Sequence, residues 1–143
     1  MLGRWRDSHH GKIVRRVLVV EDDVLLAMAL EQALEDAGVE QVVTCASADA
    51  ALHALDDALA DAIVLDVHLA DRDDGWALAE LVAMLGSPQP RIVFSTGTPE
   101  AIPPKIAEMG LVFAKPYNPA DLAKAVMNDH RTGVFARLRG ASH

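Results

Sequence analysis

The stretch Ala62-Ile63-Val64-Leu65-Asp66 decides the fold, because four successive apolar residues end abruptly in a carboxylate. The run is too short for a buried helix, and an unbroken apolar run is typical of a strand that is covered on both faces. Asp66 then lies at the carboxyl end of that strand, where open α/β sheets bind their ligands. We therefore expect a parallel sheet with Asp66 at its functional edge.

Three further short apolar runs end in polar residues in the same way. They are Val17-Leu18-Val19-Val20 before Glu21-Asp22-Asp23, Ile92-Val93-Phe94 before Ser95-Thr96-Gly97, and Leu111-Val112-Phe113-Ala114 before Lys115-Pro116. If these strands are parallel, their carboxyl ends share one edge of one sheet. Acids, a hydroxyl and an amine are then expected to meet there.

Helical patterns separate these strands, and a strand rich in β-branched residues is expected within 39–45. The apolar positions that mark the helices are Leu25 and Met28 in 24–37, Leu52, Leu55 and Leu59 after the cap Ser47, Leu78, Leu81, Val82 and Leu85 after the cap Asp74, and Leu122 and Val126 after Asn118-Pro119. Gly38 closes the first helix and Gly86-Ser87-Pro88 the third. Prolines leave only one or two helical turns between Gly97 and Gly110. Alternating strands and helices predict a doubly wound, three-layer α/β domain with helices on both faces of a parallel sheet.

The length of 143 residues and the apolar content of 51% suit one well-buried domain. We expect an irregular basic tail over 1–15, the domain over 16–128 and a second tail over 129–143. The chain has no apolar run long enough for a membrane span and no signal-peptide core at its start, so a cytoplasmic location is expected. The single Cys45 cannot form an internal disulfide.

The net charge of −8 is unevenly distributed along the chain. Residues 1–16 hold five Lys or Arg and one acid, and residues 129–143 hold three and one, so residues 17–128 carry a net charge of −14. An acidic body repels nucleic acid phosphates, and no nucleic acid partner is expected. The basic ends are solvated termini or contacts for an acidic partner.

The chemistry of the strand ends indicates phosphoryl transfer. Three carboxylates that meet repel one another, and a hard divalent cation with oxygen ligands relieves that repulsion, with Mg²⁺ the natural candidate. Lys115 adds a compact positive charge and Thr96 a neutral donor, so the group outlines a tetrahedral anion. Asp66 is the expected nucleophile, because carboxylates form acyl phosphates.

The chain resembles the receiver domain of bacterial two-component response regulators. The resemblance rests on four motifs in order, Val19-Val20-Glu21-Asp22-Asp23, Leu65-Asp66, Phe94-Ser95-Thr96-Gly97 and Ala114-Lys115-Pro116-Tyr117. The resemblance covers about residues 15–128. It implies a flavodoxin-like fold with strand order 2-1-3-4-5, and a phosphoryl group received from a sensor histidine kinase or a histidine phosphotransfer protein. Mg²⁺ is the implied cofactor, and Mn²⁺ can substitute for it.

The resemblance also assigns roles to individual residues. It implies that Asp66 is the phosphoacceptor, that Asp22 binds the metal directly and Glu21 through water, that the backbone carbonyl of His68 is a further ligand, that Thr96 and Lys115 hold the phosphoryl oxygens, and that Asp23 is an accessory acid. The chain departs from the family pattern at Ala70, where a proline is usual, and at Val112, where an aromatic residue is frequent. Phe94-Ser95-Thr96-Gly97 is similar to the motif of a subgroup of mostly single-domain regulators that often partner kinases of the HWE class, although Thr98-Pro99 does not continue it.

Two other functions of an acidic strand-end site fit the sequence less well. An aspartyl phosphatase would need a second acid two residues after Asp66, where the chain has His68, and no Gly-rich nucleotide-binding loop is present. We expect no separate enzymatic turnover beyond the phosphorylation and dephosphorylation of Asp66 itself. The alternative function is a phosphorylation-independent interaction module on the same fold. Homodimerisation is left open by the sequence.

Overall fold

The computed structural model describes residues 14–68, 76–84 and 89–128. The elements follow the order β1 (Arg16–Val20), α2 (Val24–Asp36), β2 (Gln41–Cys45), α3 (Ala48–Asp57), β3 (Ala62–Asp66), α4 (Trp76–Ala83), β4 (Arg91–Thr96), the short 3₁₀ helix η1 (Pro99–Ala101), α5 (Pro104–Ala107), β5 (Gly110–Ala114) and α6 (Pro119–Met127). One helix follows each strand except β4, which is followed by both η1 and α5.

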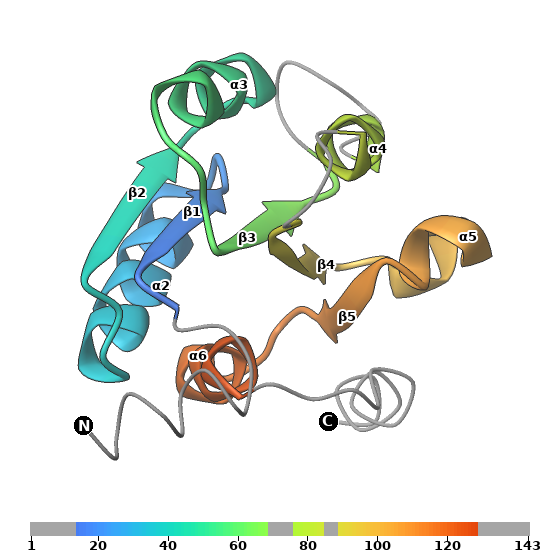
Figure 1. Ribbon diagram of the computed structural model, residues 1–143. Coiled ribbons are helices and arrows are strands. Elements are labelled where there is room, and N and C mark those ends of the chain that lie inside the picture. Colours follow the sequence, from blue (N-terminus) through green and yellow to red (C-terminus); the bar gives the residue numbers. More distant parts are fainter. Residues whose placement is uncertain (1–13, 69–75, 85–88, 129–143) are drawn as a thin grey trace.

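The five strands form one sheet in the order β2-β1-β3-β4-β5, and every pair is parallel. The predicted doubly wound sheet and its strand order are therefore confirmed. β3 is central and fully buried from Ala62 to Asp66, as its unbroken apolar run predicts. Because all strands run the same way, their carboxyl ends lie on one edge of the sheet (Figure 1).

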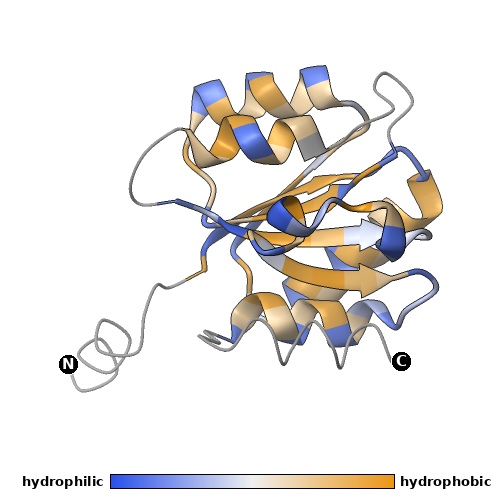
Figure 2. Cartoon of the chain, turned by 90° about the vertical axis from the view of Figure 1, so that its right-hand side faces the viewer, coloured by the Kyte–Doolittle hydropathy of each residue, from blue (hydrophilic) through white to orange (hydrophobic). Residues whose placement is uncertain are grey.

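Helices cover both faces of the sheet, with α2 and α6 on one side and α3, α4 and α5 on the other (Figure 1). The alternation of side chains along each strand decides which core a residue joins. Val17 and Val19 of β1 pack with Leu30 and Leu122 of the α2 and α6 layer. Leu18 and its neighbours on the same sheet face pack with the other layer, which includes Ala51, Leu78, Val82 and Ile106. Figure 2 shows the apolar strands enclosed between helices whose outer surfaces are more polar.

Local signals fix the ends of three helices. Asp23 caps the start of α2. Gly38 lies just beyond the end of this helix with a φ of 110°, a conformation that glycine adopts at little cost. The Ser47 side chain accepts a hydrogen bond from the backbone N–H of Ala50 at the start of α3. Asn118 caps α6 in the same way, with proline at the first helical position. The predicted caps Ser47 and Asn118 are thus confirmed.

The predicted apolar faces of three helices need correction. In α2 the buried residues are Ala27, Leu30 and Leu34, whereas Leu25 and Met28 are exposed. Packing against both β1 and α6 selects this other stripe of a helix that is apolar on several sides. Leu59 lies beyond the end of α3 and is exposed, because α3 stops at Asp57.

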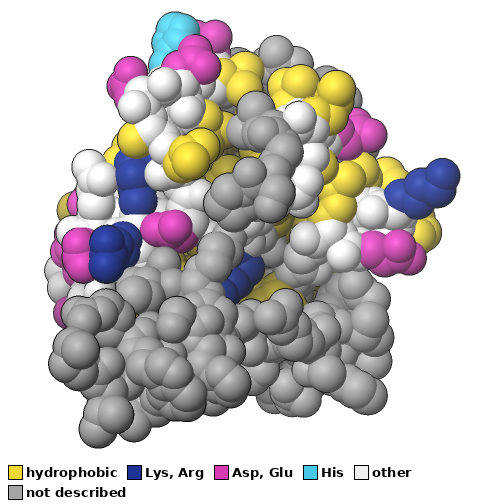
Figure 3. All heavy atoms as spheres, viewed as in Figure 1, with side chains coloured by type: hydrophobic (Ala, Val, Ile, Leu, Met, Phe, Trp, Pro, Cys, Tyr) yellow, Lys and Arg dark blue, Asp and Glu magenta, His cyan; other side chains and the backbone are white. Residues whose placement is uncertain are grey.

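α4 shows a similar difference. Leu78 and Val82 are buried as predicted, whereas Leu81 is 45% exposed. Residues three or four apart share one helix face, and Leu81 lies about 100° around the helix from Val82. Figure 3 shows apolar side chains at the surface over α3 and α4. The predicted cap Asp74, together with Leu85 and the stop at 86–88, lies outside the described residues, as do most of the two tails.

The segment between β4 and β5 is short and irregular, as the prolines predict. It contains η1 and the one-turn α5, and its two apolar anchors Ile102 and Ile106 are both buried. Gly110 begins β5 so close to β4 that a Cβ atom there would lie 2.0 Å from the carbonyl oxygen of Ile92. Within the described parts of the chain, no helix is long and apolar enough to cross a membrane.

Candidate functional site

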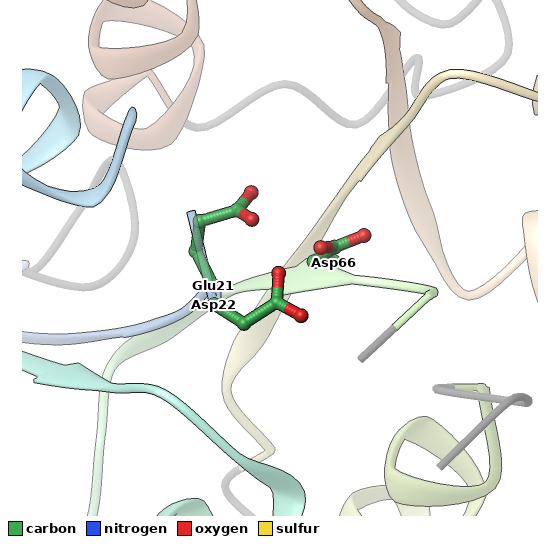
Figure 4. A group of neighbouring side chains, drawn as sticks. All are labelled: Glu21, Asp22 and Asp66. Carbon is green, nitrogen blue, oxygen red and sulfur yellow. The ribbon is translucent and has the colours of Figure 1, made fainter. Parts of the chain in front are cut away.

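Two neighbouring strands deliver three carboxylates to the same edge of the sheet. Glu21 and Asp22 directly follow β1, and Asp66 is the last residue of β3. β1 and β3 pair in register up to Val20 and Leu65, so the next residue of each strand emerges side by side. Figure 4 shows the carboxylates of Glu21 and Asp22 pointing from the end of β1 toward the side where Asp66 lies.

The three carboxylates form one compact cluster. One oxygen from each lies within 4.8 Å of the others. Glu21 and Asp66 are buried, with exposures of 3% and 4%, whereas Asp22 is exposed to solvent. Two of the three carboxylates are therefore buried at the end of the sheet, and the third faces solvent.

Lys115 contacts the cluster from the end of β5, which is the edge strand next to β4. It follows β5, and its Nζ atom lies 3.1 Å from Glu21 Oε1 and 3.6 Å from Asp66 Oδ2. The lysine side chain is 28% exposed, so its charge is only partly screened by water. One ammonium cannot neutralise three carboxylates, and the site keeps a surplus of negative charge.

The environment of Glu21 disfavours its ionised form. Burial, reinforced by the adjacent Asp66, raises its pKa to about 7, while the N–H of Asp23 and the Lys115 ammonium oppose the shift. Its Oε2 accepts a hydrogen bond from Asp23 N at 3.1 Å. Its Oε1 is buried and lacks an aligned hydrogen bond, although it forms the ion pair with Lys115. That oxygen is available to a further positive group.

The backbone just after β3 orients the carboxylate of Asp66. Its Oδ1 accepts a hydrogen bond from the backbone N–H of His68 at 3.0 Å, and its Oδ2 faces Lys115. The turn after β3 therefore fixes the plane of the carboxylate. The side chain of His68 turns to another partner, because its Nε2 lies 2.9 Å from Thr98 Oγ1.

Thr96 ends β4 beside this group and is fully buried. Its backbone carbonyl accepts a hydrogen bond from Lys115 N at 2.7 Å, which ties the ends of β4 and β5 together. Its hydroxyl oxygen accepts from Thr98 N at 3.0 Å and lies 3.4 Å from Thr98 Oγ1. In this structure the hydroxyl is thus engaged within its own loop.

Asp23 has a different position from its two neighbours. Its Oδ1 accepts hydrogen bonds from Leu25 N and Leu26 N, so its side chain caps α2. Among the described residues, the carboxylate cluster consists of Glu21, Asp22 and Asp66 without it. The role of Asp23 as an accessory acid stays a prediction.

Sequence reasoning missed one pair at the site. The hydroxyls of Ser95 and Tyr117 lie 2.7 Å apart, and the Tyr117 ring packs edge-on against Phe113 at 5.7 Å. Burial raises the pKa of Tyr117 to about 12, with smaller contributions from the charges of Glu21 and Asp66. Both residues belong to motifs visible in the sequence, but their pairing depends on the register of β4 and β5.

The comparisons with known proteins agree with this geometry. A family model described as the response regulator receiver domain matches residues 17–127. A search of curated proteins finds no match.

Several solved structures share the fold. A putative response regulator from Chloroflexus aurantiacus is 29% identical with a TM-score of 0.67, over 79% of this chain and 94% of that one. A response regulator receiver domain from Methylobacillus flagellatus is 27% identical with a TM-score of 0.67, over 76% and 92%. A response regulator protein from Burkholderia pseudomallei, solved with a phosphorylated aspartic acid, calcium ion and citrate, is 24% identical with a TM-score of 0.67, over 90% and 74%.

The family match over residues 17–127 includes the strand ends that form the acidic site, and the related structures share the fold. The chain therefore belongs to the response regulator receiver domain family.

Proposed function

We propose that the chain is a phosphoacceptor whose Asp66 receives a phosphoryl group from a histidine kinase or a histidine phosphotransfer protein. The observation that carries this proposal is the position of Asp66: buried, at a strand end, 3.6 Å from the Lys115 ammonium and within 4.8 Å of two further acids. Such an arrangement provides a carboxylate nucleophile and a cation for the incoming phosphoryl oxygens.

The donor set fits a hard divalent cation. Three carboxylates with one lysine leave excess negative charge, and the buried Glu21 Oε1 lacks an aligned hydrogen-bond partner. We propose Mg²⁺, with Mn²⁺ able to substitute, held by Asp22, Asp66 and the backbone carbonyl of His68, and by Glu21 through water. When bound, such an ion neutralises charge on the phosphoryl oxygens.

Four residues of the chain have separate roles in the transfer. The His68 N–H orients the Asp66 carboxylate, which attacks phosphorus while the bond from phosphorus to the donor histidine nitrogen breaks. Lys115 holds one phosphoryl oxygen. The Thr96 hydroxyl, which is engaged with Thr98 in this structure, turns to hold another.

Val112 is buried in the core and is too small to move as an aromatic side chain at this position would. The response to phosphorylation therefore depends on another part of the chain. We propose that the segment 97–109 orders instead, because it contains only η1 and the one-turn α5 and is held by two apolar anchors. A phosphoryl group adds about −1.5 to −2 charges, which draw the Thr96 hydroxyl and nearby backbone donors inward. The short helical segment and the motif Phe94-Ser95-Thr96-Gly97 together support assignment of the chain to the Phe-x-Thr-Gly subgroup, with a kinase of the HWE class as its partner.

Intact-protein mass spectrometry tests the assignment. Incubation with acetyl phosphate and Mg²⁺ should add one phosphoryl group to the native chain and none to Asp66→Asn. Asp56→Asn is the matched control, because Asp56 is exposed on α3, away from the site, and should label normally. Undiminished labelling of Asp66→Asn would refute the phosphoacceptor assignment, and an unlabelled native chain would favour the phosphorylation-independent interaction module.

A further inference from the structure

The turn that carries Lys115 is tied to the sheet at two points. The first is the backbone bond from Lys115 N to the carbonyl of Thr96 at 2.7 Å. Beyond it the chain leaves β5 and enters α6 through Pro116, Tyr117 and the cap Asn118. The lysine side chain reaches back across the strand ends to β1 and β3.

The second tie is the side chain of Tyr117. Its hydroxyl lies 2.7 Å from the hydroxyl of Ser95 on β4, and its ring packs edge-on against Phe113 on β5. Ser95 is in register with Asp66 on one side and with Phe113 on the other. The hydrogen bond therefore connects the lysine turn to the strand that neighbours the phosphoacceptor.

The hydrogen bond between Ser95 and Tyr117 lies in a partly buried environment. Ser95 is 1% exposed, so its hydroxyl would lose a partner that water does not readily replace. Burial raises the pKa of Tyr117 to about 12, so the phenol stays protonated and the two hydroxyls form a neutral hydrogen bond. The charges of Glu21 and Asp66 also contribute to raising the pKa of Tyr117, so its hydroxyl lies within electrostatic range of the site.

We infer that Tyr117 is a positioning residue: through its hydrogen bond with Ser95 it holds the Lys115 ammonium between the carboxylates of Glu21 and Asp66. This inference rests on the proposed function, since it concerns the lysine that binds the phosphoryl group. The two ties, one on each side of Pro116, fix where the lysine side chain starts and hence where its charge lies.

The charge of Lys115 affects the binding of two ligands in opposite directions. Lys115 repels a metal cation at the neighbouring carboxylates and attracts a phosphoryl oxygen. A lysine released from its position should therefore strengthen Mg²⁺ binding and weaken binding of a phosphoryl group. General loosening of the site would weaken both, so the two affinities together separate positioning from simple stability.

The experiment measures both affinities in Tyr117→Phe and Ser95→Ala. Calorimetry gives the Mg²⁺ dissociation constant, and a titration with beryllofluoride at saturating Mg²⁺ gives that of the phosphoryl mimic. Each variant should bind Mg²⁺ more tightly and beryllofluoride about threefold to tenfold more weakly, the equivalent of about one lost hydrogen bond. Because the two residues form one bond, the double variant should lose little more than either single variant.

Two further variants complete the test. In a Lys115→Gln background, Tyr117→Phe should leave both affinities unchanged, because no lysine remains to be positioned. Thr44→Val, which removes an exposed hydroxyl from β2, is the control and should bind both ligands like the native chain. Parallel loss of both affinities in Tyr117→Phe, or no change in either, would overturn the positioning role alone. A native chain that binds neither ligand would instead overturn the proposed function, and the inference with it.

Discussion

Replacement of Glu21 by glutamine should remove most of the pH dependence of Mg²⁺ binding. The carboxyl of Glu21 has a pKa of about 7, chiefly because it is buried and also because Asp66 lies beside it. A proton and a divalent cation compete for this carboxylate. Affinity for the metal should therefore rise with pH as Glu21 loses its proton, and fall as the pH drops through about 7.

The magnitude follows from the titration of one group. With a pKa of about 7, roughly nine-tenths of the Glu21 side chains are ionised at pH 8 and roughly one-tenth at pH 6. If the bound state needs the ionised form, the apparent affinity falls about tenfold between these pH values, or about 1.4 kcal/mol. At pH 7 the binding of one ion should release about half a proton.

Calorimetry at pH 6, 7 and 8, at constant ionic strength, measures both quantities. Buffers with different ionisation enthalpies report the released protons directly. Glu21→Gln should bind more weakly at pH 8 and show little change down to pH 6. Asp23→Asn is the matched control, since asparagine also caps helices and Asp23 lies outside the cluster. A native chain without the pH slope, or a slope that persists in Glu21→Gln, would refute the reasoning.

Three further outcomes are expected. In a metal titration, Asp22→Ala should weaken Mg²⁺ binding more than Asp23→Ala does, and equal losses of affinity would contradict the separate roles of the two acids. In urea unfolding, Asp23→Ala should lower the free energy of unfolding by about 1 kcal/mol, because it removes the cap of α2. Gly110→Ala should destabilise the fold by about 1 to 3 kcal/mol, because its Cβ would overlap the carbonyl of Ile92, and an unchanged unfolding midpoint would show that β5 shifts freely. Hydrogen exchange of residues 97–109 should be fast in the free protein and slower with beryllofluoride; protection equal to that of α2 in the free protein would exclude the proposed ordering.

Much of the site followed from the sequence because of one property of parallel α/β sheets. Short apolar runs mark the buried strands, and a parallel arrangement forces their carboxyl ends to one edge. The polar residues at the carboxyl ends of β1, β3 and β5 therefore had to converge, and Glu21, Asp66 and Lys115 do so. Caps such as Ser47 and Asn118 were predictable for a related reason, since they act on residues two or three positions away.

The tertiary structure decided what depends on residues distant in the chain. α2 is apolar on several sides, and only its packing against β1 and α6 selects Leu30 and Leu34 over Leu25 as the buried residues. The bond between Ser95 and Tyr117 requires the register of β4 with β5, which no local pattern encodes.

The electrostatics of the site also belong to the assembled fold. The pKa of Glu21 depends on burial and on Asp66, which is 45 residues away in the chain, and both exist only after the sheet has formed. The sequence by itself thus determined which chemical groups reach the edge of the sheet. The tertiary structure determined their protonation, their partners and the position of each charge, because these follow from distances of a few ångströms between separate strands.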